Sequence, residues 1–301
     1  MRISTRFAAV LIALIGSACF TSLASAGNPH GYDLASPDAI YTLPESLREM
    51  SALTYVNPEA LVCVEDERGI LYTYNPAANV ITTQTTFGAE GDYEGLARVD
   101  ETMYVLRSDG QLFEVMGYSS EAPEVILHET AVPAKNNEGL CYDKARNRLL
   151  IAAKSKSGKG SEFKDTRLVY EFDLKTRSMR EEPVFVFDLQ EITELARKAG
   201  VEVPEKKNKK KGEASAAVIQ LRPSGIAVHP ATEELYLLSG SNHLLVVFTM
   251  DGMLRYIEEM DPDIFNKPEG ITFTEDGDML ISNEGETNKS ATILRFNSKA
   301  R

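Results

Sequence analysis

The chain has no tryptophan, only three cysteines and only four histidines among its 301 residues. It contains no Gly-x-Ser-x-Gly nucleophile elbow, no His-Glu-x-x-His metal pair and no Walker-type phosphate loop, so it carries no signature of those enzyme classes. It also lacks an excess of basic residues: 32 Lys and Arg against 45 Asp and Glu give a formal net charge of −13, which argues against nucleic acid as a partner. Acidity of this degree serves solubility and is compatible with binding cations.

The first 26 residues differ in composition from the rest of the chain. Two arginines precede an apolar stretch over 7–15, and Ala24-Ser25-Ala26 resembles a signal-peptidase cleavage site. The apolar stretch is too short to span a bilayer, so the pattern predicts a secretory signal peptide over 1–26 and a periplasmic or secreted protein. Lipid attachment at Cys19 is the less favoured alternative, because Gly16 stands where a lipoprotein signal has an aliphatic residue.

Two cysteines remain outside this segment, Cys63 and Cys141. Each lies in an apolar, strand-like context, and the repeats described next place them in blades that are not neighbours. We therefore predict two buried free thiols and no disulfide. No later segment reaches the ~20 apolar residues of a spanning helix, so we expect no transmembrane segment, and we expect a monomer.

A short phrase recurs five times along the chain, a Ser or Glu followed by a small residue and an aliphatic one. The first residues of successive copies are 43, 44, 86 and 45 positions apart. The copies are Ser51-Ala52-Leu53, Glu94-Gly95-Leu96, Glu138-Gly139-Leu140, Ser224-Gly225-Ile226 and Glu269-Gly270-Ile271. A period near 43 is typical of blade-repeating architectures, so the spacing predicts a β-propeller.

Each repeat contains four short stretches rich in Val, Ile, Leu, Tyr and Phe, separated by turn residues. The fifth repeat lacks an outer strand, and the region after the signal segment contains an orphan strand over 38–43. A propeller closes when one end of the chain completes the blade made by the other, which removes exposed edges. We therefore predict one all-β domain over 36–301 with five blades; six blades is the alternative, because the 86-residue step leaves room for a degenerate one.

The long step contains an insertion at about 189–221. Asp188 and Glu191 have capping-box spacing, and Gly200 follows an apolar helical face, so we predict one helix here. The lysine-rich segment over 205–212 follows. It is interpreted as a solvated loop, with an anion or membrane contact as the alternative.

The first residue of every copy carries a side-chain oxygen, and a propeller brings equivalent positions of its inner strands together around one axis. Three carboxylates in one small space repel one another unless some are protonated or a cation lies among them. No His or Cys shares these positions, and hard cations prefer oxygen ligands. The pattern predicts a Ca²⁺ site formed by Ser51, Glu94, Glu138, Ser224 and Glu269.

Polar residues of the neighbouring loops are expected on the same face as this ring. A mixture of Arg, Lys, Asn and acids around a metal is suited to a polar or anionic ligand, although turns are polar in any case. The candidate ligand-binding residues are Glu65, Asp92, Arg107, Asn137, Lys154, Arg222, Lys267, Asn283 and Glu284.

Several segments together resemble the SdiA-regulated (YjiK-like) family of periplasmic proteins. They are the stretches over 51–55, 93–97, 137–143, 152–156, 237–239, 268–271 and 281–284. The resemblance covers the chain from about residue 36 to the end, apart from the insertion. It implies an exported β-propeller, and the family has no settled biochemical activity.

The order Ser, Glu, Glu, Ser, Glu is also similar to the calcium ring of the five-bladed calcium-activated nucleotidases. That likeness implies calcium at the same five positions. The tryptophan-containing segments of those enzymes have no counterpart here, since the chain has no tryptophan.

Three functions follow as hypotheses. The first is a calcium-stabilised binding or scaffold propeller whose partner is a small molecule or a protein, and it makes the protein more a binder than an enzyme. The second is a calcium-dependent phosphoester or phosphoanhydride hydrolase, in which the metal orients substrate and activates water. The third, a lactonase-like propeller, is disfavoured because those sites usually include His at the metal, and the ring has none.

Overall fold

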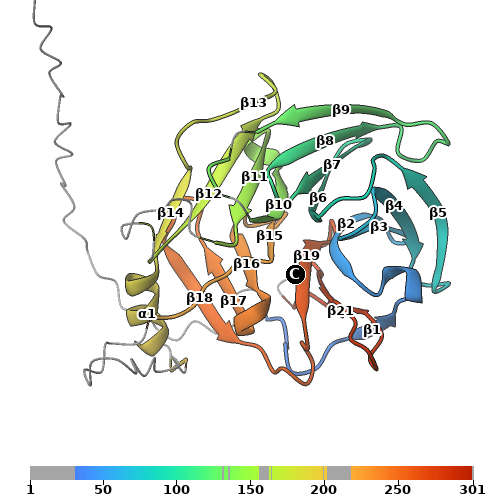
Figure 1. The fold of residues 1–301 in the computed structure, drawn as a ribbon. Coiled ribbons are helices and arrows are strands. Elements are labelled where there is room, and N and C mark those ends of the chain that lie inside the picture. Colours follow the sequence, from blue (N-terminus) through green and yellow to red (C-terminus); the bar gives the residue numbers. More distant parts are fainter. Residues whose placement is uncertain are drawn as a thin grey trace, which may run out of the picture.

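The structure is a computed structural model that describes residues 31–130, 132–134, 136–155, 163, 165–198, 200–201 and 218–299. The predicted signal peptide, Cys19 and the lysine-rich segment over 205–212 lie outside the described residues. The described chain forms five antiparallel sheets arranged around one axis, so the prediction of a five-bladed β-propeller is confirmed. Figure 1 looks down this axis, with the first strand of each repeat nearest the centre.

The first four blades contain their strands in chain order, from the axis to the rim. The first two blades are β2 (Met50–Asn57), β3 (Ala60–Glu65), β4 (Ile70–Asn75) and β5 (Val80–Thr86), then β6 (Tyr93–Val99), β7 (Thr102–Arg107), β8 (Gln111–Met116) and β9 (Glu124–Glu129). The third is β10 (Asn137–Asp143), β11 (Arg148–Ala153) and β12 (Thr166–Asp173), with β13 (Ser178–Met179) and β14 (Phe185–Asp188) both pairing with β12. The fourth is β15 (Gly225–Val228), β16 (Leu235–Ser239), β17 (Leu244–Phe248) and β18 (Leu254–Glu259).

The fifth blade joins the two ends of the chain. It consists of β19 (Pro268–Phe273), β20 (Met279–Asn283), β21 (Thr292–Phe296) and the N-terminal strand β1 (Ala39–Thr42). β1 pairs antiparallel with β21 from Ala39 opposite Arg295 to Thr42 opposite Thr292. The predicted closing strand is therefore confirmed, and it pairs with the outer edge of β21.

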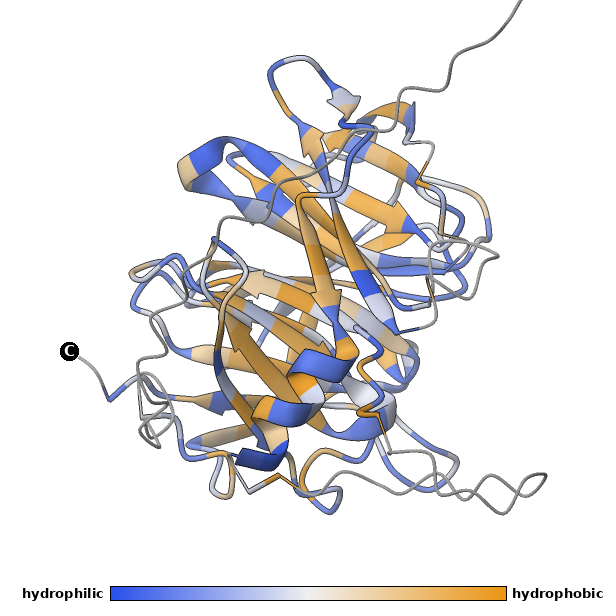
Figure 2. Cartoon of the chain, turned by 90° about the vertical axis from the view of Figure 1, so that its left-hand side faces the viewer, coloured by the Kyte–Doolittle hydropathy of each residue, from blue (hydrophilic) through white to orange (hydrophobic). Residues whose placement is uncertain are grey.

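The hydrophobic core lies between the blades, in five clusters of buried side chains. In Figure 2 the strands are largely apolar and the connecting loops are mostly hydrophilic. Cys63 and Cys141 are both buried and free, as predicted. Among the described residues, no helix has the length and apolar character needed to cross a membrane.

One helix, α1 (Leu189–Lys198), follows β14 at the start of the insertion. The carboxylate of Asp188 accepts hydrogen bonds from the backbone N–H groups of Gln190 and Glu191, at 2.7 and 3.4 Å, which caps the helix as predicted. Gly200 has a φ of +82°, a left-handed conformation that ends helices and favours glycine. The apolar face of α1 packs against the third and fourth blades through Leu189, Ile192 and Ala196.

Candidate site at the top of the central channel

The five Ser and Glu positions lie where the inner strands begin, on the face of the propeller that we call the top. We call Ser51, Glu94, Glu138, Ser224 and Glu269 the axial ring. In four blades the pairing register slips by one residue at this point, between Met50 and Ala52, Tyr93 and Gly95, Asn137 and Gly139, and Pro268 and Ile271. The ring residue therefore lies in a β-bulge in each of these blades, and a bulge redirects a side chain away from the regular pleat.

The small residue after each ring position lies where one blade closely approaches the next. A Cβ added to Gly95 would lie 2.7 Å from Leu140 Cβ, and one added to Gly225 would lie 2.7 Å from the carbonyl oxygen of Glu269. Real side chains do not tolerate such contacts, so the glycine is required by packing. The recurring phrase thus combines a side chain at the axis with a close contact between blades.

The two serines link neighbouring blades through hydrogen bonds. Ser51 Oγ donates to the carbonyl of Tyr93 at 2.6 Å, and Ser224 Oγ donates to the carbonyl of Pro268 at 3.0 Å. Ser224 Oγ also accepts the N–H of Gly240 at 3.1 Å. A hydroxyl that donates its proton still has lone pairs for a cation, although one lone pair of Ser224 is already used.

The three ring glutamates lie in one shared electrostatic field. Burial, followed by the negative charges of Glu138 and Asp92, raises the pKa of Glu94 to about 9. Burial also raises the pKa of Glu269 to about 7, with Lys154 opposing the shift and Glu138 adding to it. The pKa of Glu138 is raised by burial as well, against the opposing effect of Lys154. Burial is the largest cause of each shift, and neighbouring acids add to it in all three.

The ammonium group of Lys154 lies beside the axial ring. Its Nζ lies 2.6 Å from Glu138 Oε2, and Glu138 is only 2% exposed. Burial lowers the pKa of Lys154, but the charges of Glu138, Glu269 and Glu94 outweigh that effect and raise it. One ammonium group thus interacts electrostatically with three carboxyl groups.

The space on the axis beneath the ring is small. A cavity of about 10 Å³ is lined by ring residues and by the aliphatic residues two positions later in each strand, and this is about the room that one water molecule needs. The carboxylate oxygens of the three ring glutamates do not all lie within 4.8 Å of one another. Among the described residues, the acids that do are Glu49, Glu65 and Glu67, a group at the edge of the top face.

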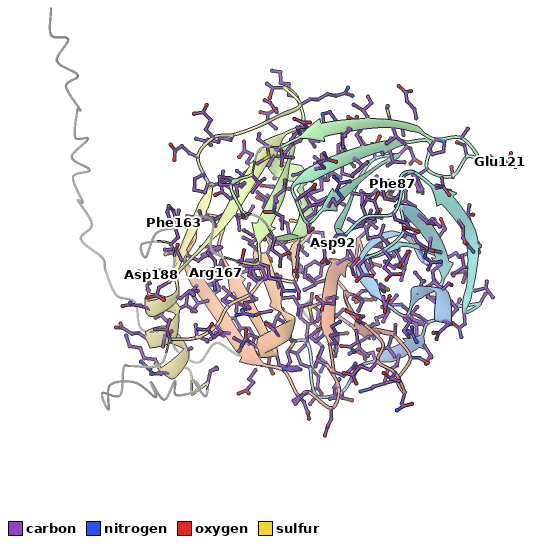
Figure 3. All side chains as sticks on the ribbon, viewed as in Figure 1. Phe87, Asp92, Glu121, Phe163, Arg167 and Asp188 are labelled. Carbon is purple, nitrogen blue, oxygen red and sulfur yellow. The ribbon has the colours of Figure 1, made fainter. Side chains whose placement is uncertain are left out.

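The predicted ligand-binding residues divide into two groups. Those coupled to the ring are Asp92, Lys154, Lys267 and Glu284: Asp92 raises the pKa of Glu94 and Glu138, Lys267 lowers that of both Glu138 and Glu269, and Glu284 forms an ion pair with Lys267. Asp92 lies near the centre of the ring of blades in Figure 3.

The other predicted residues form hydrogen bonds with residues outside the axial ring. Glu65 accepts the backbone N–H and the Nε–H of Arg68, at 2.8 and 2.7 Å, and Arg107 donates two hydrogen bonds to Asp109. The amide groups of Asn137 and Asn283 are buried and donate to loop carbonyls, such as those of Ser108 and Ile264.

Arg222 is exposed and lies near Arg167. Arg167 holds the chain in place where it returns from the insertion. Arg167 Nε donates to the carbonyl of Leu221 at 2.6 Å, and the Arg167 side chain is only 6% exposed. Burial, together with the charge of Arg222, lowers the pKa of Arg167. Arg167 on β12 and Asp188 on β14 lie in the same blade, and Figure 3 shows both away from the axis.

The structure places Asp66, a loop residue on the top face, beside the Glu49, Glu65 and Glu67 group. Burial and the negative charges of Glu49 and Glu284 raise its pKa to about 6. The acidic run over 65–67 was a visible signal, but nothing in the sequence places Glu49 next to it.

Comparisons with known proteins show the fold. No protein-family model and no curated protein matches the chain. Among solved structures, the glutaminyl cyclase of Myxococcus xanthus matches with a TM-score of 0.56 and 12% identity, over 87% of this chain and 95% of that one. A Bacteroides thetaiotaomicron protein of unknown function matches with a TM-score of 0.50 and 14% identity, over 81% of this chain and 58% of that one. At these identities the likeness establishes a β-propeller and carries no activity with it.

Proposed function

We propose that this chain is an exported, calcium-binding β-propeller of the SdiA-regulated type, which binds a small molecule or a protein on its top face around a central Ca²⁺. The observation that carries the proposal is that Glu94, Glu138 and Glu269 share the charge of two ammonium groups, those of Lys154 and Lys267, of which Lys267 is already paired with Glu284. Asp92 adds a fourth negative charge. A divalent cation is the simplest counter-charge for such a set of hard oxygen ligands.

The donor set fits calcium better than a transition metal. The ring contains three carboxylates and two hydroxyls, and water completes the six to eight oxygens that Ca²⁺ takes. The carboxylates are farther apart than a closed site requires, so we expect the glutamate side chains to move toward the ion when it binds. Lys154 would then release part of its hold on Glu138.

The ligand site is proposed around this ion, where Lys154 and Lys267 present positive charge beside Asp92 and Glu284. Such a mixture suits a ligand with both acidic and basic groups. The export proposal rests on the signal-like segment over 1–26, and the family proposal rests on the sequence resemblance described above.

A calcium-dependent hydrolase of phosphoesters or phosphoanhydrides is the second candidate. Its supporting observation is the positive charge that Lys154 and Lys267 bring beside the ring glutamates, where a bound ion would orient a phosphate substrate. Lys154, near Glu94 and Glu138, would neutralise phosphate charge. Turnover of ATP, ADP or p-nitrophenyl phosphate that requires Ca²⁺ and Glu94 would favour this candidate.

The test of the proposal compares thermal unfolding and calorimetric titration with Ca²⁺ in the wild type and in Glu94→Gln. Gln copies the protonated form of Glu94, so the variant should be at least as stable as the wild type in chelator. Calcium at 100 times its Kd should stabilise the wild type by about 2.7 kcal/mol and the variant far less. Magnesium serves as the comparison ion.

Two matched variants make the result specific. Glu59→Gln removes one exposed charge from a turn on the opposite face and should keep the full response to calcium. Glu67→Gln removes an exposed acid of the Glu49, Glu65 and Glu67 group, and should also keep it. A calcium response lost in Glu67→Gln but kept in Glu94→Gln would move the site away from the axis, and no response in the wild type would end the proposal.

A further inference from the structure

The central channel has a second and much larger space at its other end. A cavity of about 370 Å³ opens on the face opposite the axial ring. All five inner strands and the turns that follow them line it, including Asp100, Lys144, Pro230 and Glu275. Small-molecule sites in proteins begin at about 300 Å³, so this lower cavity has the size of a ligand site.

The roof of the lower cavity is a ring of aliphatic side chains. Leu53, Leu96, Leu140, Ile226 and Ile271 occupy the third position of the recurring phrase, and we call them the sealing layer. They line both the lower cavity and the small space under the axial ring, so they separate the two. The fourth position in each strand is small or short: Thr54, Ala97, Cys141, Ala227 and Thr272. Small residues below a closed roof create the hollow.

Three of the five strands contribute an aromatic side chain to the walls. The fifth position of each strand carries Tyr55, Arg98, Tyr142, Val228 and Phe273, and all five line the cavity. Tyr55 and Tyr142 are each half-buried, so parts of their rings are available to a ligand. Aromatic rings favour other rings that stack or meet them edge to face.

Two basic side chains line the cavity, Arg98 on the inner strand of the second blade and Lys144 in the turn that follows the inner strand of the third. Arg98 donates to the carbonyl of Val56 at 3.2 Å and to Glu101 at 3.3 Å, which fixes its guanidinium at the wall. Lys144 is exposed at the mouth, and no ion pair links it to another described residue. Glu275 lies on the fifth blade, and Asp100 lies in the turn that follows β6.

We propose that the lower cavity is a binding site for a small molecule with an apolar, ring-containing body and one negative charge. The body lies against the sealing layer and the tyrosine side chains, and the negative charge lies toward Lys144 at the mouth. No residue of the axial ring lines the lower cavity, and the sealing layer lies between the two. The proposed site therefore does not depend on the cation site.

The test uses 8-anilinonaphthalene-1-sulfonate, a probe with aromatic rings and one sulfonate, and its uncharged analogue N-phenyl-1-naphthylamine. Because the chain has no tryptophan, Tyr55→Trp introduces a single indole into the cavity wall. Both probes should bind this variant saturably, with one site per chain, and quench its indole emission. Binding should be the same with chelator and with calcium.

Two further variants locate the site. Thr272→Phe fills the cavity and should weaken both probes about tenfold or more. Lys144→Gln should weaken the sulfonate probe severalfold and leave the uncharged one unchanged, whereas Lys175→Gln, an exposed lysine in an outer turn, should change neither. Cooperative melting checks that each variant is folded.

The proposal fails if the wild type shows no saturable binding, or if Thr272→Phe melts cooperatively and binds both probes as the wild type does. If Thr272→Phe does not fold, unquenched indole in Tyr55→Trp at saturating probe overturns it. Equal losses of both probes in Lys144→Gln would contradict the assignment of a negatively charged ligand.

Discussion

The two ends of the central channel are made by the same five strands, yet they differ in chemistry. At the top, the first position of each strand carries Ser or Glu, and the space beneath is about 10 Å³. At the bottom, the fifth position is aromatic in three blades, and the cavity is about 370 Å³. Four residues along a strand separate an ion-sized, acidic space from a ligand-sized one with both polar and apolar lining residues.

The difference shows where the propeller is constrained and where it is free. The second and third positions are uniform around the axis, because each small residue must fit against the neighbouring blade and each aliphatic one seals the channel. The first and fifth positions line the two ends of the channel, and their residue types differ from blade to blade, although Phe273 also packs in the core. Function in such a fold is therefore carried by the residue types at these two levels.

The largest expected effect comes from a change that damages both ends. In Gly225→Ala the new Cβ would lie 2.7 Å from the carbonyl oxygen of Glu269, and backbone cannot yield as a side chain can. We expect a loss of about 1–3 kcal/mol in the free energy of unfolding, together with weaker binding of calcium and of the aromatic probes. Chemical denaturation and the two titrations measure these losses.

Ala52→Gly is the matched control, because alanine already occupies the equivalent position of the first blade. It should cost no more than about 1 kcal/mol and leave both ends intact. If Gly225→Ala proved as stable as the wild type, the close contact between blades would not be what requires glycine at this position.

Much of the fold could be predicted from the sequence, because the repeat and its turns are local signals. The five copies, the closing strand over 38–43 and the helix after Asp188 all agree with the structure. The equivalence of the ring positions followed from the period. The β-bulges did not, because a one-residue slip in pairing depends on the neighbouring strand and leaves no mark in spacing.

The site was less predictable than the fold. Nothing in the sequence shows that Lys154 pairs with Glu138, or that Asn137 and Asn283 are tied to loop carbonyls. The lower cavity was missed for a different reason. Tyr55, Arg98, Tyr142, Val228 and Phe273 share no residue type, so their common position becomes visible only when the strands are seen side by side.

The next effect sharpens the contrast, because only the top end should respond to pH. In chelator, Glu94 and Glu269 keep their protons to about pH 9 and 7 in the folded protein, but lose them near their ordinary value of 4.5 when the chain unfolds. The folded state therefore binds more protons over this interval, so the free energy of unfolding should fall as pH rises from about 4.5 to 9. Each unit of pKa difference corresponds to about 1.4 kcal/mol, reduced here because both groups are partly exposed.

Calcium should reverse this trend by holding the carboxylates ionised. Its binding should tighten as pH rises and release about one proton per ion at neutral pH, chiefly from Glu94. Titration calorimetry in buffers of different ionisation enthalpy counts the protons. Glu94→Gln should flatten the decline above pH 7, and probe binding in the lower cavity should stay unchanged from pH 6 to 8. A wild-type stability that rose over pH 5–8 in chelator would contradict the raised pKa of Glu94.

The smallest effect separates the two kinds of residue within the axial ring. Ser51→Ala and Ser224→Ala each remove a hydrogen bond between blades, which contributes about 1 kcal/mol to stability. We expect calcium affinity to fall less than tenfold in either variant, because a hydroxyl is a weak ligand and water can replace it, and to fall far more in Glu138→Gln, because a buried carboxylate has no such substitute. Ser224→Ala should cost more stability than Ser51→Ala, since Ser224 also accepts the N–H of Gly240.

Equal losses of calcium affinity in the serine and glutamate variants would mean that all five positions contribute alike to binding the ion. If calcium affinity were unchanged in Glu138→Gln, the ion would bind somewhere other than the axial ring. The top of the channel would then be an ion-pair network around Lys154 and not the metal site.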